Sequence, residues 1–131
     1  MIERYSRKEI KSIWEDKNRY SIWLQIELAA AEAMEKMNMI PKGVSKKVRT
    51  KAKINVKRIL QIEEKVKHDV IAFLTSITEK VGKDARYLHK GMTSSDVLDT
   101  CFNLQLKQSG KILLKDIDIL LKTIKKQSIK H

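Results

Sequence analysis

The chain has 131 residues, of which 42% are apolar and 34% are charged, a composition typical of one globular domain and not of a disordered or fibrous protein. Lysine and arginine number 28 against 16 aspartate and glutamate, and the net charge of +12 favours an anionic partner such as nucleic acid or a polyanionic metabolite. A single cysteine excludes an internal disulfide, and no run approaches the ~18 apolar residues of a membrane span, so we expect a cytoplasmic protein.

One proline, four glycines and interleaved apolar and charged residues predict an all-α fold. Ser6 and Glu9 fit a capping box, which predicts a short helix through Trp14. A second helix is expected to follow Asp16 and to end within residues 38–41. The apolar positions that keep its 3.6-residue period are Trp23, Ile26, Ala30, Ala33, Met34 and Met37.

Two further helices are predicted in the middle of the chain. Asn55 can cap a helix that runs through Val66 and follows a weaker, basic helical segment. His68 interrupts the pattern, and Asp69 is a suitable N-cap for the next helix. Gly82 is expected to end that helix, because glycine often follows a helix C-terminus.

From Asp96 onward the apolar residues form one stripe that stays in phase across Gly110. The stripe consists of Leu98, Phe102, Leu106, Leu113, Ile117, Leu120 and Ile124. Glycine inside a helix costs only about 1 kcal/mol, so we predict one continuous helix and not a hairpin. Some 36 residues at 1.5 Å each give roughly 54 Å, whereas a compact domain of this size is about 36 Å across. The stripe should therefore pack against other subunits, or against a continuation of the chain beyond His131.

The segment before this long helix contains a histidine, His89, and three consecutive hydroxyls, Thr93, Ser94 and Ser95. The first N–H groups of a helix lack internal partners and carry the positive end of its dipole. A phosphate or carboxylate is therefore favoured there. A plain N-cap is the alternative for this segment taken alone.

Two other segments can carry chemistry. Arg4 and Tyr5 can clamp a phosphate, although an N-terminal Arg-Tyr is also common as surface decoration. Lys67, His68 and Asp69 lie at a helix junction, where the carboxylate favours an imidazolium and the helix N-terminus opposes it. Such balance suits a proton-transfer group, although a lone histidine is often structural.

Taken together and in this order, the segments resemble the N-terminal part of the adenylosuccinate lyase family, within the fumarase/aspartase superfamily. The resemblance covers all 131 residues. Its most specific parts are a His-Asp-Val segment and a Gly-x-Thr-Ser-x-Asp-Val-x-Asp-Thr segment, which differ from the fumarase and argininosuccinate lyase versions. The matching positions are residues 1–7, Ile13, Trp14, Asn18, Arg19, Tyr20, Trp23, Leu24, Glu27, Ile40, Pro41, Lys42, Arg58, Ile59, Glu63, residues 67–70, Ala72, Phe73, His89, Gly91, Thr93, Ser94, Asp96, Val97, Asp99 and Thr100.

The resemblance implies cleavage of adenylosuccinate to AMP and fumarate, and of SAICAR to AICAR and fumarate, in purine nucleotide biosynthesis. The reaction is a β-elimination that needs no cofactor and no metal. It also implies a homotetramer whose active sites each take residues from three subunits. Residues 1–93 would be the N-terminal helical domain and residues 94–131 the start of the central bundle. The chain stops before the family's Thr-His segment and lacks its mobile serine loop, so we expect it to be inactive alone.

The resemblance also implies roles for the first and second segments of the candidate site. Arg4 and Tyr5 would bind the nucleotide phosphate. Lys67, His68 and Asp69 would line the substrate site, with His68 in an acid or proton-orienting role.

The third segment receives its roles from the same resemblance. Thr93 and Ser94 would hold a succinyl carboxylate at the helix N-terminus, and His89 would help to place the nucleotide. We expect all three segments to converge on one pocket for a nucleotide that bears several negative charges.

The alternative from another class is a basic helical module that binds nucleic acid, as the lysine-rich residues 42–58 and 107–130 suggest. Such modules usually add a recognisable reading element or stacking aromatics to their charge. This chain has only two Trp, three Tyr and two Phe, mostly at core-like positions. A helical interaction protein that presents its long stripe to a partner is the third interpretation.

Overall fold

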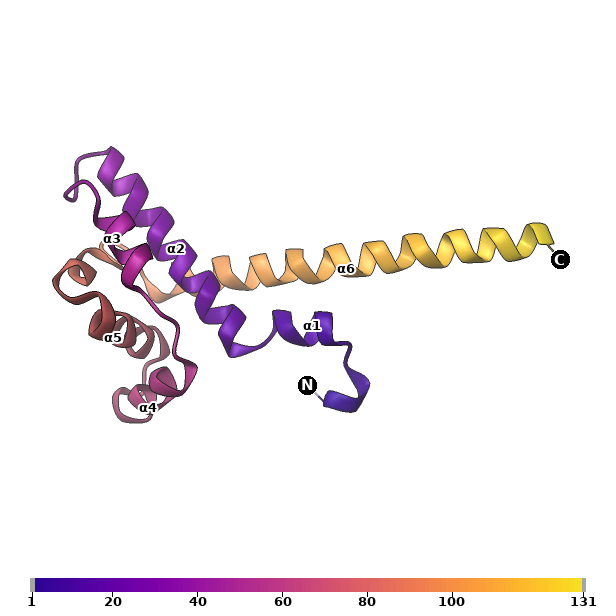
Figure 1. Ribbon diagram of the computed structural model, residues 1–131, viewed down its shortest axis with the longest axis horizontal. Helices are drawn as coiled ribbons and strands as arrows, with labels where there is room; N and C mark the ends of the chain where they lie inside the picture. Colours follow the sequence, from indigo (N-terminus) through magenta and orange to yellow (C-terminus); the bar gives the residue numbers. More distant parts are fainter. Residues whose placement is uncertain (1, 131) are drawn as a thin grey trace.

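The structure is a computed structural model that describes residues 2–130, and helices are its only regular elements over that range, which confirms the all-α prediction. Helices α2 to α5 gather at one end, and α6 extends away from them as a rod (Figure 1). In chain order the elements are η1 (Glu3–Tyr5), α1 (Lys8–Ile13), α2 (Asp16–Lys36), α3 (Val44–Lys51), α4 (Val56–Val66), α5 (Asp69–Val81), η2 (Gly82–Tyr87) and α6 (Ser94–Lys130).

An aromatic cluster forms the centre of the core. Tyr20 and Trp23 on α2 meet edge to face with ring centroids 5.2 Å apart, and Phe73 on α5 packs at 5.5 Å from Trp23. All three side chains are fully buried, and Val97 and Cys101 bring the first turns of α6 into the same core. Edge-to-face contacts suit the quadrupoles of the rings, so this cluster stabilises the core between α2 and α5.

The buried face of α2 differs in part from the predicted one. Trp23 and Met34 are buried as expected, but Ala33 and Met37 are exposed. The difference arises because the buried face includes Glu27, a charged residue that a search for apolar periodicity passes over.

The predicted capping box at the start of α1 is wrong. Arg7 occupies the N-cap position and makes no side-chain cap bond. The hydroxyl of Ser6 instead donates to the carbonyl oxygen of Ile2, at 2.7 Å. A serine hydroxyl can satisfy a nearby backbone group in this way, and it is then no longer directed at the helix N-terminus.

The α4–α5 junction follows the sequence prediction with a shift of one residue. Asn55 caps α4 as predicted, accepting the N–H of Arg58 at 3.1 Å. The N-cap of α5 is His68 and not Asp69, which is the first helical residue. Gly82, with φ of 78°, follows the end of α5 as predicted.

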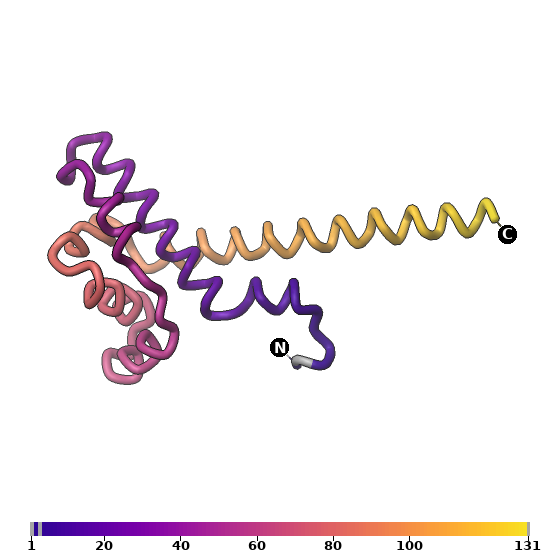
Figure 2. Tube along the Cα trace, viewed as in Figure 1, coloured from indigo at the N-terminus to yellow at the C-terminus, as the bar shows by residue number. Residues whose placement is uncertain are grey.

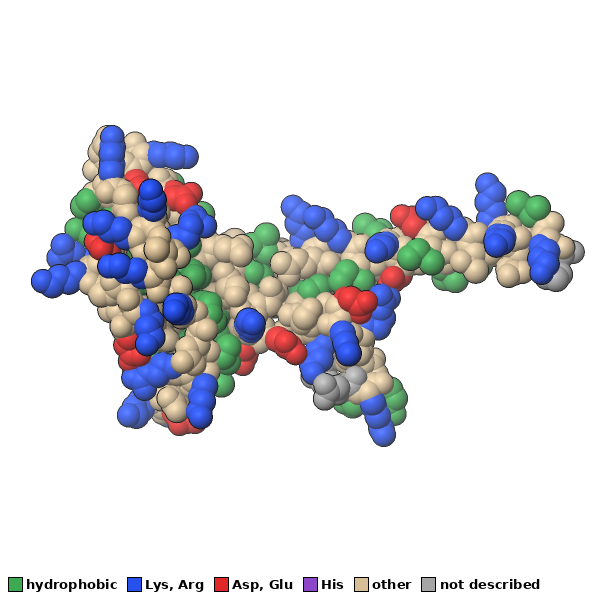
Figure 3. Space-filling model, in the orientation of Figure 1, with side chains coloured by type: hydrophobic (Ala, Val, Ile, Leu, Met, Phe, Trp, Pro, Cys, Tyr) green, Lys and Arg blue, Asp and Glu red, His purple; other side chains and the backbone are tan. Residues whose placement is uncertain are grey.

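Helix α6 runs without a break through Gly110 for 37 residues, as predicted (Figure 2). Leu98 packs against the core, whereas the stripe residues from Phe102 to Ile124 are 45–57% exposed. Figure 3 shows apolar side chains along the rod, between charged ones. Within residues 2–130, no helix has both the length and the apolar character needed to cross a membrane.

The N-terminal segment that includes α1 contacts the side of α6. The carbonyl oxygen of Ile13, at the end of α1, accepts from the amides of Asn18 at 2.8 Å and Gln105 at 2.7 Å. Arg7 forms an ion pair with Asp116 further along α6. These contacts hold α1 beside α6, away from helices α3 to α5.

Candidate functional site

Thr93, the residue before α6, donates two hydrogen bonds to one carboxylate in the first turn of the helix. The carboxylate of Asp96 accepts the backbone N–H of Thr93 at 2.7 Å and its hydroxyl at 2.9 Å. The backbone and hydroxyl donors of Thr93 lower the pKa of Asp96, so that the carboxylate stays ionised. Within the described part of the chain, the hydroxyls of Ser94 and Ser95 make no hydrogen bond, so they are the donors left for an external anion at this helix end.

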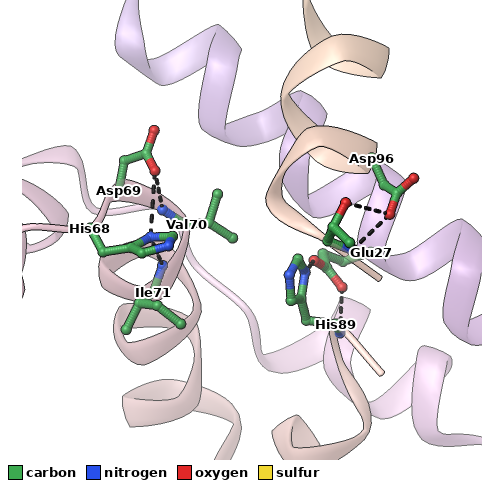
Figure 4. Close-up of polar contacts among 8 residues, drawn as sticks. Glu27, His68, Asp69, Val70, Ile71, His89 and Asp96 are labelled. Atoms are coloured by element: carbon green, nitrogen blue, oxygen red, sulfur yellow. Dashed lines mark hydrogen bonds and ion pairs between the residues drawn. The ribbon is translucent and has the colours of Figure 1, made fainter. Parts of the chain in front are cut away.

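His89 is held against a buried carboxylate from another helix (Figure 4). Oε1 of Glu27 on α2 lies 2.7 Å from Nδ1 of His89, and Oε2 accepts the backbone N–H of the same residue at 2.6 Å. The Glu27 side chain is fully buried, and that of His89 is 18% exposed. His89 also has φ of 58°, in the left-handed region, so the carboxylate supports an unfavourable backbone conformation.

The sequence predicts no role for Glu27, although this residue is one of the positions that match the family. The signal that could have found it is a carboxylate on the buried face of an apolar helix, four residues after Trp23 and four before Ala31. Charged side chains are almost never fully buried unless they are paired. Such a residue therefore predicts a partner, although its position in the sequence does not say which one.

His68 caps α5 through its ring. Nδ1 accepts the backbone N–H of Ile71 at 3.4 Å, and this bond requires Nδ1 to be unprotonated. Nδ1 also lies 3.6 Å from Oδ1 of Asp69, a contact that would be an ion pair only for an imidazolium. The same oxygen of Asp69 accepts the N–H of Val70 at 2.7 Å. With Nδ1 as the acceptor, Nε2 carries the ring proton and can donate a hydrogen bond to a ligand.

Lys67 ends α4 with φ of 54° and is exposed. Its neighbours Leu60, Glu63 and Glu64 line a shallow hollow of about 380 Å³ with it, and neither His68 nor His89 lines that hollow.

Arg4 and Tyr5 lie apart from the other candidate residues within one chain. Both are exposed, and the guanidinium of Arg4 stacks 4.8 Å from the Tyr5 ring centroid. The nearby ion pair of Arg7 with Asp116 holds this segment beside the rod, roughly 33 Å along α6 from Ser94 at 1.5 Å per residue. The expectation that all three segments converge is thus wrong for a single chain, because residues 2–7 follow α6 and not the core.

The two histidines come from different elements and form two separate polar groups in Figure 4, His68 with Asp69 and His89 with Glu27. Within residues 2–130, the groups of three or more His, Cys, Asp or Glu side chains that a metal ion needs are absent. The arrangement offers two oriented imidazole rings and a helix N-terminus, which is a set of proton-transfer and anion-binding groups.

A family model described as a lyase matches residues 3–131. The adenylosuccinate lyase of Bacillus subtilis (strain 168) is 43% identical over 131 residues, which cover 100% of this chain and 30% of that relative. The adenylosuccinate lyase of Thermotoga maritima is 48% identical over 117 residues, which cover 89% of this chain and 27% of that relative. The chain therefore spans about 30% of the length of these curated relatives.

A solved structure of a fumarate lyase from Mesorhizobium sp. BNC1 shares the fold, with a TM-score of 0.79 and 19% identity. The similarity covers 86% of this chain and 27% of that one.

Proposed function

Because the chain belongs to the lyase family whose model it matches, we propose that it is the N-terminal part of an adenylosuccinate lyase. The complete protein would cleave adenylosuccinate to AMP and fumarate, and SAICAR to AICAR and fumarate, in purine nucleotide biosynthesis. The observation that carries this proposal is the 43% and 48% identity to two curated adenylosuccinate lyases, along 100% and 89% of the chain.

The chemistry is a β-elimination. A base removes a proton from carbon in the succinyl group, the electron pair forms the double bond of fumarate, and the carbon–nitrogen bond breaks. The departing nitrogen takes a proton from an acid. Positioned acids and bases each contribute roughly 10² to 10⁴ in rate, and fixed donors stabilise the negative charge that develops on the carboxylate.

His68 suits an acid or proton-orienting role in this reaction. Its Nδ1 accepts the N–H of Ile71, so Nε2 can donate a hydrogen bond that orients a ligand, and an acid role would require Nδ1 to exchange the Ile71 bond for a proton. Lys67 and Asp69, its neighbours at the same junction, would line the substrate site.

A succinyl carboxylate at the start of α6 would meet the hydroxyl of Ser94 first. Ser94 has no partner within the described part of the chain, whereas Thr93 donates both its N–H and its hydroxyl to Asp96. Thr93 can contribute only if it exchanges these bonds. His89 would place the nucleotide close by.

The complete active site would combine more than one copy of the protein. Arg4 and Tyr5, the proposed phosphate ligands, lie beside the rod and not near the histidines of their own chain. The exposed stripe on α6 is available to pack in the central bundle of a homotetramer. We propose residues 1–93 as the N-terminal domain, residues 94–131 as the start of that bundle, and the cytoplasm as the location. The substrate is a small nucleotide, and no cofactor, nucleic acid or membrane takes part.

The test is fumarate release from adenylosuccinate by the chain together with its natural continuation beyond residue 131. His68→Gln should lower kcat by about 10² or more, because a neutral amide cannot transfer a proton. The matched control is Gln61→Ala, an exposed polar position on the outer part of α4, which should leave kcat unchanged. Absence of fumarate release from the unsubstituted protein would overturn the proposal.

A further inference from the structure

Glu27 is the buried charged residue on which the position of His89 depends. It lies 62 residues away in the chain, and both of its carboxylate oxygens bind His89, one the backbone N–H and the other the ring. A fully buried carboxylate is retained in a protein when its partners compensate for the loss of water. Here every such bond is made to one residue.

The carboxylate determines which nitrogen of the His89 ring carries a proton. An ionised carboxylate can only accept, so the 2.7 Å contact requires a proton on Nδ1. Nε2 lies on the side of the ring turned away from Glu27 and has no hydrogen-bond partner among residues 2–130 (Figure 4). Nε2 is therefore the nitrogen that remains for a ligand.

The two candidate histidines are held in opposite ways. Nδ1 of His68 accepts from a backbone N–H, whereas Nδ1 of His89 donates to Glu27. In the neutral rings, His68 thus presents a donor at Nε2 and His89 presents an acceptor that can also take up a proton.

We propose that Glu27 is a positioning residue of the nucleotide site: it fixes the His89 ring with a proton on Nδ1 and presents Nε2 to the substrate. The proposal rests on the function proposed above, because that function supplies the ligand. Carboxylates that orient a histidine through its other nitrogen act in the same way in metal sites and hydrolase triads.

A purely structural role would be support of the left-handed backbone at residue 89. Glutamine can give that support, because its carbonyl oxygen can accept the N–H of His89 while its amide N–H donates to Nδ1. Glu27→Gln thus keeps the shape of the contact and moves the ring proton from Nδ1 to Nε2. The Glu27→Gln substitution therefore distinguishes support of the backbone at residue 89 from control of the protonated nitrogen in the His89 ring.

The experiment compares the complete enzyme, its Glu27→Gln variant, its His89→Asn variant and the double variant. Asparagine tolerates the left-handed region and removes the ring. The ¹⁵N chemical shifts of the His89 ring report which nitrogen is protonated, and steady-state kinetics give KM and kcat for adenylosuccinate. We expect Glu27→Gln to switch the protonated nitrogen and to raise KM by about ten- to a hundredfold, with a smaller change in kcat. In the double variant, Glu27→Gln should change KM little beyond the effect of His89→Asn alone.

Unchanged ring shifts in Glu27→Gln, or a switched ring with unchanged KM, would overturn the proposal. If Glu27→Gln does not fold, an unchanged KM in His89→Asn would overturn it equally. Failure of the proposed function is distinguishable, because it appears as no fumarate release from the unsubstituted protein while the ring shifts remain measurable.

Discussion

The guanidinium of Arg7 forms an ion pair with the carboxylate of Asp116, and this contact ties the first residues of the chain to the middle of α6. The two residues are 109 positions apart in the sequence. The candidate phosphate ligands of the N-terminal segment are therefore located by the rod and not by the helical core that carries both histidines.

Loss of this ion pair should free the N-terminal segment without unfolding the protein. Exposed ion pairs contribute little to stability, so we expect Asp116→Asn to leave Tm almost unchanged. Hydrogen exchange at residues 4–13 should become faster. Asp118→Asn, an exposed aspartate on the same helix, is the control and should change neither quantity. Equal exchange rates in both variants would show that the ion pair does not hold the segment.

Gln105 should stabilise the packing of α1 on α6. Its buried amide donates to the carbonyl oxygen of Ile13 at 2.7 Å. Gln105→Leu removes that donor and should lower the free energy of unfolding by about 1–2 kcal/mol, as measured by urea denaturation. Gln25→Leu changes an exposed glutamine on α2 and should stay within about 0.5 kcal/mol of the parent.

Two phenylalanines should respond in opposite ways to truncation. Phe73 is fully buried in the aromatic cluster, so Phe73→Ala should cost about 3–5 kcal/mol of unfolding free energy. Phe102 is 52% exposed on the α6 stripe. Phe102→Ala should cost less than about 1 kcal/mol in the monomer and should instead weaken self-association, as measured by analytical ultracentrifugation. Wild-type association in Phe102→Ala would contradict the proposed role of the stripe.

Arg4 should contribute to binding of the nucleotide phosphate in the complete enzyme. Arg4→Ala removes a charge-assisted donor and should raise KM for adenylosuccinate by about tenfold or more. The chain offers a close control, because Arg86 stacks 5.0 Å from the Tyr87 ring centroid, much as Arg4 stacks on Tyr5 at 4.8 Å. Arg86→Ala should leave KM unchanged, and similar KM values for the two variants would remove Arg4 from the phosphate site.

Asp96 should add stability that depends on acid pH. Its pKa is lowered in the folded protein by the N–H and hydroxyl of Thr93. The contribution is therefore fully present above the unfolded pKa of about 4 and is lost as pH falls through the lower folded value. The Asp96→Asn variant should have a lower Tm than the parent at neutral pH. When the pH is lowered from about 4 to 2, the Tm of the variant should fall less than the Tm of the parent. Asp99→Asn, one turn further along α6, is the control for a general charge effect.

Local signals predicted the fold well. The cap at Asn55, the end of α5 at Gly82 and the unbroken helix through Gly110 all depend on residues within a few positions of one another. The two errors at helix starts have a similar local cause. The hydroxyl of Ser6 donates to the carbonyl oxygen of Ile2, and the ring of His68 occupies the cap position that the sequence predicts for Asp69.

Long-range contacts in the candidate site could not be predicted in the same way. The pairing of Glu27 with His89 and the fastening of Arg7 to Asp116 join residues 62 and 109 positions apart. No periodicity or capping rule relates such positions. Sequence patterns therefore identify the candidate side chains, whereas the packing of α2 and α6 determines which of these side chains are in contact. The substrate roles of these residues stay predictions.

If the start of α6 binds an anion as proposed, its capping arrangement should also select among ligands. The carboxylate of Asp96 is tethered three residues from Thr93 and acts as an intramolecular competitor for the same donors. Tethering over so short a span gives an effective concentration of millimolar or above. A simple monovalent anion in free solution competes poorly with such a group. A polyanion that is already anchored elsewhere in the proposed site would have the same advantage of proximity and should displace the Asp96 carboxylate.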